Sequence, residues 1–314
     1  MRAVFLDSQS LDNNDIDFSA LRASVAELVL RPNTKTEELP AALRDQQIVI
    51  SNKVRLDANT LQQCPELKLI CVAATGTNNI DLFAAKSLGI RVCNVRGYAT
   101  PSVSQLVLSY MLNHFCRLQD YQQAAVDGRW SRSPFFCLLD FPIAELHGKT
   151  LGIIGYGELG QAVARLAESF GMHILIAQGK NKNGQRVPLT QLLQQSDVVS
   201  LHCPLTEKTR HLISAAELAQ MKPSALLINT ARGGIVDEDA LIQALRKRQI
   251  GGACFDVLSQ EPPPPEHPML QKDIPNLRLT PHIAWASREA RQRLCDQLAS
   301  NIQAFSQGKL VNEV

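Results

Sequence analysis

The sequence has no apolar run near the ~18 residues that a membrane-spanning helix needs, and it has no excess of charge of one sign. Its 32 Lys and Arg residues balance 30 Asp and Glu residues, for a net charge of +2 at pH 7. We therefore expect no nucleic-acid partner and no membrane partner. The first residues reach Asp7 after a very short apolar run, which is typical of a first strand and not of a signal peptide. These absences favour a cytoplasmic protein.

The spacings typical of metal sites and disulfide frameworks are also absent. The eight cysteines form no CxxC pair, and the seven histidines form no HxxxH or HExxH motif. Buried thiols in a reducing compartment explain the cysteines, and we predict no metal site. The chain does have 45% apolar residues in a length of 314, which is enough for sizeable cores. At roughly 150 residues per domain, this length indicates two domains.

Short β-branched runs alternate with helical stretches through the first hundred residues. Strands separated by helices predict crossover connections and a parallel sheet. A long helix is predicted next, from about Pro101 to Asp127, with the proline in its first turn. The predicted strands of this first part are residues 2–6, 27–30, 47–51, 67–72 and 90–94.

The alternation restarts at Lys149, and a helix over 158–170 follows the first strand of the new series. The last 28 residues are predicted to be mostly one helix, with Ser287 as its N-cap and Gly308 as its stop. The sequence does not place this last helix against either sheet. The predicted strands of this second part are residues 150–154, 173–177, 197–201, 225–229, 252–257 and 277–279.

A glycine-rich loop joins the first strand and helix of the second part, with the sequence GYGELG. Gly155 would make the tight turn, and Gly157 would let a pyrophosphate approach the backbone. Gly160 would let the helix pack closely on the strand. The N–H groups at the helix start would then face the anion. This arrangement predicts a dinucleotide-binding site.

The residue after the second strand of this part decides between NAD and NADP in such sites. An NAD site usually has a carboxylate there for the ribose 2′-hydroxyl, whereas this chain has Gln178. Glutamine can bind a hydroxyl and does not repel a 2′-phosphate. Lys180, Lys182 or Arg186 could attract that phosphate, or could form an ordinary exposed basic loop. The predicted cofactor is therefore NAD(H) or NADP(H), with the preference open.

Charged side chains follow three further strands, at the edge where ligands bind in a doubly wound sheet. Arg232 would hold a substrate carboxylate and polarise its ketone, because a guanidinium suits planar oxyanions. His282 would protonate the developing alkoxide, and Glu261 would orient the imidazole. Asp256 ends the strand before Glu261. Together these residues predict the reduction of a 2-keto acid.

The motifs GYGELG, NTARGGIVDEDAL, DVLSQEPP and TPHIAWAS follow one another in the chain, and with them the sequence resembles the D-2-hydroxyacid dehydrogenase family over nearly its whole length. The resemblance implies an α/β protein with two Rossmann-like parallel-sheet domains. One is a flavodoxin-like substrate domain, discontinuous over 1–99 and 287–314. The other, over 100–286, is a doubly wound NAD(P)-binding domain that includes a long dimerisation helix near 101–127. It also implies a homodimer with the active site in the cleft between the domains.

The segments ATGTNNID and HIAW are most similar to the glycerate dehydrogenase, or hydroxypyruvate reductase, branch of that family. This similarity implies a substrate carboxylate on the loop Thr75, Gly76 and Thr77, with Trp285 beside it. Gln105-Leu106 departs from the family, whose members often have histidine second. Asp256 is expected to accept from the nicotinamide carboxamide. With the glycine loop and Lys180 included, the expected cofactor contacts are Gly155, Gly157, Glu158, Leu159, Gly160, Gln178, Lys180, Cys203, Pro204, Thr230, Ala231, Arg232, Asp256, His282 and Ala284.

The expected activity is hydride transfer between a nicotinamide cofactor and a small D-2-hydroxy acid or 2-keto acid, with hydroxypyruvate or glyoxylate as the favoured substrate. A phosphoglycerate dehydrogenase is an alternative within the same class. It would want further cations for the substrate phosphate, and often a regulatory tail. A dinucleotide-sensing binding protein of the same fold is an alternative from another class, because such proteins keep much of the same set of residues.

Overall fold

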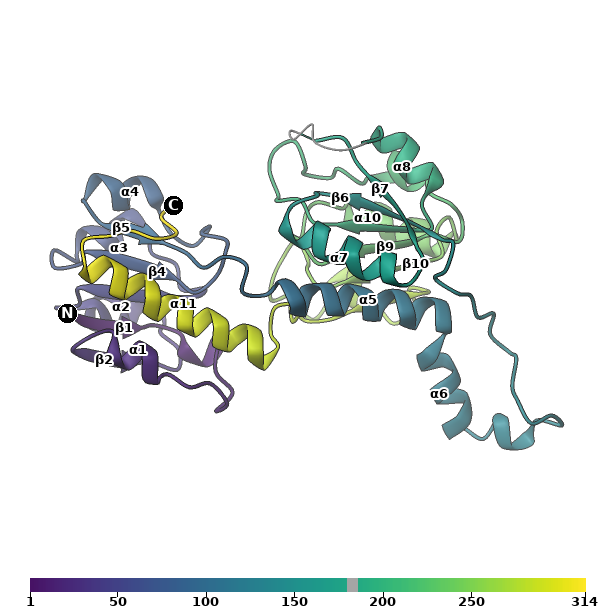
Figure 1. Ribbon diagram of the computed structural model, residues 1–314, viewed down its shortest axis with the longest axis horizontal. Coiled ribbons are helices and arrows are strands. Elements are labelled where there is room, and N and C mark those ends of the chain that lie inside the picture. The colour runs from purple at the N-terminus through teal and green to yellow at the C-terminus, as the bar shows by residue number, and fades with distance from the viewer. Residues whose placement is uncertain (180–185) are drawn as a thin grey trace. The chain divides into compact units, whose positions relative to one another are not determined.

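The computed structural model describes residues 1–179 and 186–314 of the chain. The chain forms two compact units, one of Met1–Ala99 with Trp285–Val314 and one of Thr100–Ala284. Each unit is an α/β layer structure around one parallel sheet, which confirms the predicted fold class (Figure 1). Among the described residues, no helix is both long and apolar enough to cross a membrane.

The sheet of the first unit has the strand order β2-β1-β3-β4-β5, and all its pairs are parallel. This is the order of flavodoxin-like sheets. Every residue of β3 and β4 is buried, because helices cover both faces of the sheet. The strands are β1 (Arg2–Phe5), β2 (Glu27–Leu30), β3 (Ile48–Ser51), β4 (Leu69–Val72) and β5 (Arg91–Cys93).

Five helices cover this sheet. α1 (Ser19–Ala23) and α11 (Arg288–Ser306) share one apolar core with one face of the sheet. α2 (Leu39–Leu43), α3 (Ala58–Gln62) and α4 (Leu82–Ser87) share the core on the other face. Short 3-10 turns lie at Ser8–Ser10 and Thr36–Glu38.

The C-terminal helix therefore belongs to the first unit, although it follows the second in sequence. Leu294, Leu298 and Ile302 of α11 are fully buried against the first sheet. The predicted caps are confirmed: the Ser287 hydroxyl accepts a hydrogen bond from Ala290 N at 3.2 Å, and Gly308 follows the helix with a φ of +74°.

The sheet of the second unit has the strand order β11-β10-β9-β8-β6-β7, again all parallel. A single parallel bridge pairs Ala177 with Val187 beyond β7. Counted with that bridge, the order becomes the one typical of a doubly wound dinucleotide-binding sheet. The strands are β6 (Thr150–Ile154), β7 (His173–Ile176), β8 (Val198–Leu201), β9 (Leu226–Asn229), β10 (Gly252–Phe255) and β11 (Leu277–Leu279).

One face of the second sheet shares a core with α8 (Leu189–Gln195), α9 (Ala215–Leu218) and α10 (Glu238–Arg246). On the other face α7 (Glu158–Ser169) packs against α5 (Thr100–Cys116), as Figure 1 shows. Short 3-10 turns lie at Trp130–Arg132 and Pro268–Leu270.

The prediction of one continuous helix from Pro101 to Asp127 is wrong. The stretch is two helices, α5 and α6 (Leu118–Val126), because Arg117 between them adopts a left-handed conformation with a φ of +53°. The Arg117 Nε atom pairs with Asp120 at 2.7 Å, which holds the break. A single left-handed residue ends the regular helical hydrogen bonding, and periodicity alone does not indicate one.

Trp285 and Ala286, expected in the NAD(P)-binding domain, belong to the first unit in the structure. Trp285 packs against the core of the first sheet and meets the Tyr98 ring edge-to-face at 6.4 Å. An indole buries much apolar area, so this packing sets the unit boundary just before Trp285.

Candidate active site

The glycine loop lies at the carboxyl end of β6, in the second unit. Gly155 has a φ of +99°, and an added Cβ there would lie 2.5 Å from Cys203 N, on the loop after β8. An added Cβ at Gly160 would lie 2.4 Å from Gly155 O. Only glycine therefore fits at these two positions, and the loop, the helix start and the β8 end are held close together.

The residues around this loop fit a dinucleotide. An added Cβ at Gly157 would meet nothing within 4 Å, so there is open space beside the N-terminus of α7. Within the described residues, the buried atoms Thr230 Oγ1 and His202 Nδ1 have no hydrogen-bond partner. Buried polar groups without a partner are rare, and both follow strands that end at this edge. They mark places where a polar ligand would complete the structure.

His202 was missed by the sequence analysis, although it precedes Cys203 directly. Its Nε2 lies 2.9 Å from the Ser200 hydroxyl. Burial lowers the pKa of His202 to about 4, so the ring is neutral near pH 7. The sequence signal that could have found His202 is its place directly after a buried strand of this sheet.

The end of β7 brings Gln178 and Arg186 close together. Gln178 N donates to Val187 O at 2.9 Å, and the Arg186 guanidinium donates to Ala177 O at 3.3 Å. Arg186 is thereby held beside the residue that usually selects the cofactor. Lys180 and Lys182, the other predicted cations, lie outside the described residues.

Arg232 lies directly after β9, in a loop that is fixed by side-chain hydrogen bonds. The buried Asn229 side chain accepts from Ala231 N at 3.0 Å and donates to Arg232 O at 2.9 Å. The Arg232 guanidinium donates to Ala231 O at 2.7 Å and is exposed. The loop therefore presents an accessible guanidinium at the carboxyl edge of the sheet.

Glu261 and His282 form a close pair. The His282 Nδ1 lies 2.6 Å from Glu261 Oε2, and each side chain is about one-third exposed, at 31% and 34%. The other carboxylate oxygen, Oε1, accepts from Leu258 N at 2.9 Å. This carboxylate holds the imidazole in one orientation and defines Nδ1 as the donor toward it.

Asp256 holds the loop that carries His282. Its side chain is 1% exposed, and it accepts from Ile283 N and Ala284 N, both at 2.8 Å. The Thr280 hydroxyl also donates to it, at 2.5 Å, and bonds to the Tyr110 hydroxyl. Burial raises the pKa of Asp256. The expected bond to a nicotinamide carboxamide stays a prediction, because these contacts join the carboxylate to the loop after β11.

The other expected cofactor residues of this unit lie at the same edge of the sheet. Glu158 and Leu159 begin α7, and the Glu158 carboxylate accepts from the Thr100 hydroxyl at 2.6 Å. Those that follow the ends of β8, β9 and β11 are Cys203, Pro204, Thr230, Ala231 and Ala284.

Thr75, Gly76 and Thr77 lie in the first unit, in the loop between β4 and α4. The Thr75 hydroxyl donates to Val95 O at 2.9 Å, and Asn94 Nδ2 donates to Thr75 O at 2.7 Å. These bonds fix the loop at the carboxyl end of β4. Trp285 belongs to this unit as well.

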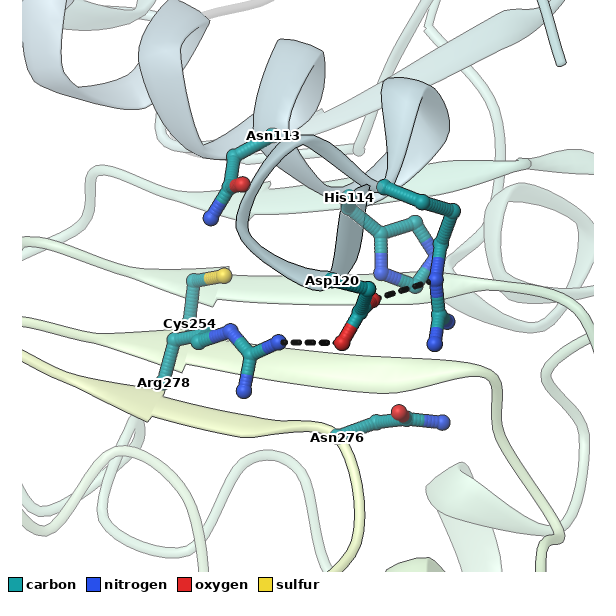
Figure 2. A pocket seen from close by; sticks show the side chains of 7 residues that line it. Asn113, His114, Asp120, Cys254, Asn276 and Arg278 are labelled. Atoms are coloured by element: carbon teal, nitrogen blue, oxygen red, sulfur yellow. Dashed lines mark ion pairs between the residues drawn. The ribbon is translucent and has the colours of Figure 1, made fainter. Parts of the chain in front are cut away.

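A separate pocket of the second unit lies over the middle of β10 and β11 and not at the strand ends. Its volume of about 10 Å³ has room for about one water, so it cannot take a dinucleotide. Asp120 pairs with two arginines, at 2.7 Å from Arg117 Nε and 3.9 Å from Arg278 Nη2, and Figure 2 shows Asp120 and Arg278 in this pocket. His114, beside them, has its pKa lowered to about 4 by burial and by the two arginines.

His114 should make the protein less stable in acid. The unfolded chain binds a proton on histidine below about pH 6.5, whereas folded His114 does so only near pH 4. Its contribution is therefore fully present above pH 6.5 and is lost as the pH falls toward 4, by about 2 kcal/mol at pH 5. We expect His114→Gln to reduce the difference between the free energies of unfolding that urea denaturation gives at pH 7.5 and at pH 5. Part of this difference should remain in the variant, because the pKa of His202 is lowered as well. An unchanged difference would contradict the role in acid sensitivity that we assign to His114.

The fold and the strand-end residues define a nicotinamide-dinucleotide-dependent oxidoreductase. The model of the family described as D-isomer specific 2-hydroxyacid dehydrogenase, NAD binding domain, matches residues 108–284. The chain belongs to this family, and its second unit is the family's NAD-binding domain.

Two curated relatives cover the whole chain. It is 46% identical to a glycerate dehydrogenase of Methylorubrum extorquens, over 100% of this chain and 98% of that one. It is 35% identical to a hydroxypyruvate reductase of Blautia hydrogenotrophica, over 100% and 99%. Among solved structures, an NADPH-dependent glyoxylate/hydroxypyruvate reductase of Sinorhizobium meliloti, in complex with NADP and malonate, is 28% identical. That structure has a TM-score of 0.81 and covers 100% of this chain and 96% of its own.

Proposed function

We propose that this protein reduces hydroxypyruvate or glyoxylate to the D-2-hydroxy acid with a nicotinamide cofactor. The observation that carries the proposal is the Glu261–His282 pair, at 2.6 Å, on the sheet edge that also presents Arg232 and the glycine loop. Relatives named glycerate dehydrogenase and hydroxypyruvate reductase support these substrates.

The residues divide the chemistry among them. A dihydronicotinamide cofactor held at the Gly155–Gly160 loop would supply the hydride for the carbonyl carbon of the substrate. Arg232 holds the carboxylate and carbonyl oxygens, because its planar donors match two oxygens at once. His282 gives a proton to the alkoxide from Nε2, since Nδ1 is the nitrogen that donates to Glu261. In the oxidative direction the same ring takes up the hydroxyl proton.

We assign the substrate carboxylate also to the backbone N–H groups of Thr75, Gly76 and Thr77. A short loop before a helix offers N–H donors that the helix itself does not use. Trp285 is assigned as a substrate contact. The residues predicted to bind the cofactor keep that role in the proposal, with His202 added because its buried Nδ1 has no partner among the described residues.

The test is loss of dihydronicotinamide absorbance with purified protein against hydroxypyruvate, glyoxylate, pyruvate and 2-ketobutyrate. We expect turnover of hydroxypyruvate or glyoxylate to exceed turnover of pyruvate and 2-ketobutyrate. Dinucleotide binding without turnover of any keto acid would replace the proposal with a sensing role.

We further propose that NADPH is the better cofactor. Gln178 stands where a carboxylate would repel a 2′-phosphate, and Arg186 is held beside it through Ala177 O. We expect Arg186→Ala to lower kcat/KM for NADPH by about 10- to 100-fold, the worth of a hydrogen bond to a charged group. The value for NADH should stay unchanged.

The matched variant is Gln178→Asp, which adds a carboxylate at the same place. It should lower kcat/KM for NADPH and raise it for NADH. Equal losses with both cofactors in Arg186→Ala would show that the arginine supports the loop and does not bind a phosphate.

A homodimer is part of the proposal. α6 and the segment to about residue 143 extend away from the second sheet (Figure 1) and carry exposed apolar side chains. Val126 is 84% exposed, Phe136 92% and Leu139 81%. Several large apolar side chains exposed on one segment are typical of a protein interface, and a second copy of the chain is the partner that we assign to it. Light scattering after gel filtration should give the mass of two chains.

We also place the protein in the cytoplasm, in keeping with its free cysteines.

A further inference from the structure

We propose that Glu238 is a positioning residue for the Glu261–His282 pair, and that it acts by holding the peptide between Leu258 and Ser259. Leu258–Glu261, called here the 258–261 turn, follows β10 and carries the carboxylate that orients His282. The kinetic consequences rest on the proposed function, whereas the contacts do not.

Glu238 binds the turn through both of its carboxylate oxygens. Its Oε1 accepts from Ser259 N at 2.7 Å, and its Oε2 accepts from the Ser259 hydroxyl at 2.8 Å. Two charge-assisted bonds to one residue fix its orientation as well as its position. A helix cap does not explain this geometry, because Asp237 already caps α10 by accepting from Ala240 N at 3.0 Å.

A glycine supports the same peptide where the Arg232 loop meets the turn. An added Cβ at Gly233 would lie 1.8 Å from Leu258 O and 2.0 Å from Leu258 C. The Leu258 carbonyl therefore packs directly on Gly233, the residue after Arg232. The Arg232 loop and the 258–261 turn are thus in contact, and Glu238 holds the next residue of the turn.

The position of the peptide determines the position of the catalytic pair. Leu258 N donates to Glu261 Oε1 at 2.9 Å, and the other oxygen of the same carboxylate meets His282 Nδ1 at 2.6 Å. A shift of Leu258 moves the donor that fixes the carboxylate. The contacts therefore run from Glu238 through the turn to the imidazole that transfers the proton.

Glu238 also lies close to His267. His267 Nδ1 accepts from Met269 N at 3.3 Å, so the ring carries its proton on Nε2. That nitrogen lies 3.5 Å from Glu238 Oε2, and the two side chains are only 10% and 14% exposed. The carboxylate is largely shielded from water, where its bonds are stronger than at an exposed surface.

The test compares Glu238→Ala and Glu238→Gln with Asp239→Ala as the matched control. Asp239 is the exposed acid in the same first turn of α10, so its loss removes the same charge near the helix start. Glutamine can still accept from Ser259 N and donate to the Ser259 hydroxyl. The measurements are kcat and KM for hydroxypyruvate, and hydrogen exchange of the peptide that contains Ser259.

We expect Glu238→Ala to lower kcat by about 10- to 100-fold, the size of effect that small misplacements of catalytic groups produce. KM and the dinucleotide Kd should stay near wild type. Exchange at Ser259 should rise. Glu238→Gln should restore most of kcat, and Asp239→Ala should resemble wild type.

A kcat for Glu238→Ala within twofold of wild type would overturn the proposal, as would a lowered kcat that Glu238→Gln does not restore. Equal effects of Glu238→Ala and Asp239→Ala would assign the loss to helix charge. If wild type reduces no keto acid, the proposed function fails, while unchanged exchange at Ser259 in Glu238→Ala would separately refute the contact to the turn.

Discussion

Replacing His282 by Gln should lower kcat for hydroxypyruvate reduction by about 100- to 10,000-fold, the range for loss of a general acid. The amide keeps a polar group in the same loop but cannot deliver a proton near neutral pH. Asp256 should still hold the loop, since it binds the backbone N–H groups of Ile283 and Ala284. The effect should therefore fall on kcat and leave the KM for the keto acid nearly unchanged.

Two further variants separate proton transfer from simple damage. Glu261→Gln keeps an acceptor for Leu258 N but removes the negative charge from His282, so its loss should be smaller and should vary with pH. His173→Gln changes an exposed histidine at β7 and should match wild type. A His282→Gln enzyme with wild-type kcat would mean that another group supplies the proton.

Removing Arg232 should have an effect of similar size on kcat/KM. Loss of one preorganised donor to a developing oxyanion costs about 100- to 1,000-fold, and Arg232 is proposed to hold the carboxylate as well. Arg232→Ala should therefore raise KM and lower kcat together. Arg232→Lys keeps the charge but not the planar pair of donors, so it should recover only part of the loss. Steady-state kinetics with hydroxypyruvate measures both.

The control is Arg165→Ala, at an exposed arginine of α7, which should behave as wild type. Dinucleotide binding to Arg232→Ala, followed by dihydronicotinamide fluorescence, should be kept. Keto-acid turnover that survives Arg232→Ala would remove the assigned role and leave the fold assignment unaffected.

The core of the site was open to sequence reasoning because its parts are local. A strand, a glycine loop and a helix are contiguous at Gly155–Gly160, and parallel strands bring their carboxyl ends to one edge wherever they lie in the chain. Arg232, Glu261 and His282 could thus be named from their places after strands. The 2.6 Å contact between Glu261 and His282 agrees with the orienting role predicted for Glu261, and their catalytic roles stay proposals.

The sequence did not indicate the contacts that join distant segments. Glu238 and Ser259 are 21 residues apart, and nothing in either segment shows that a carboxylate binds a particular backbone N–H. His202 could be noticed from its place after a predicted strand, but that its Nδ1 has no partner among the described residues is visible only once the surrounding atoms are placed. The break at Arg117 depends on one backbone conformation, which apolar periodicity does not report.

By itself, the sequence determined two parallel α/β units, the glycine loop and the set of charged residues after the strands, because each follows from hydrophobic periodicity and short-range geometry. Only the tertiary structure decided that Val187 extends the second sheet beyond β7 and that Glu238 holds the 258–261 turn. These features depend on burying apolar faces and satisfying hydrogen bonds between segments far apart in the chain. Such contacts depend on the complete tertiary structure and not on any single stretch of residues.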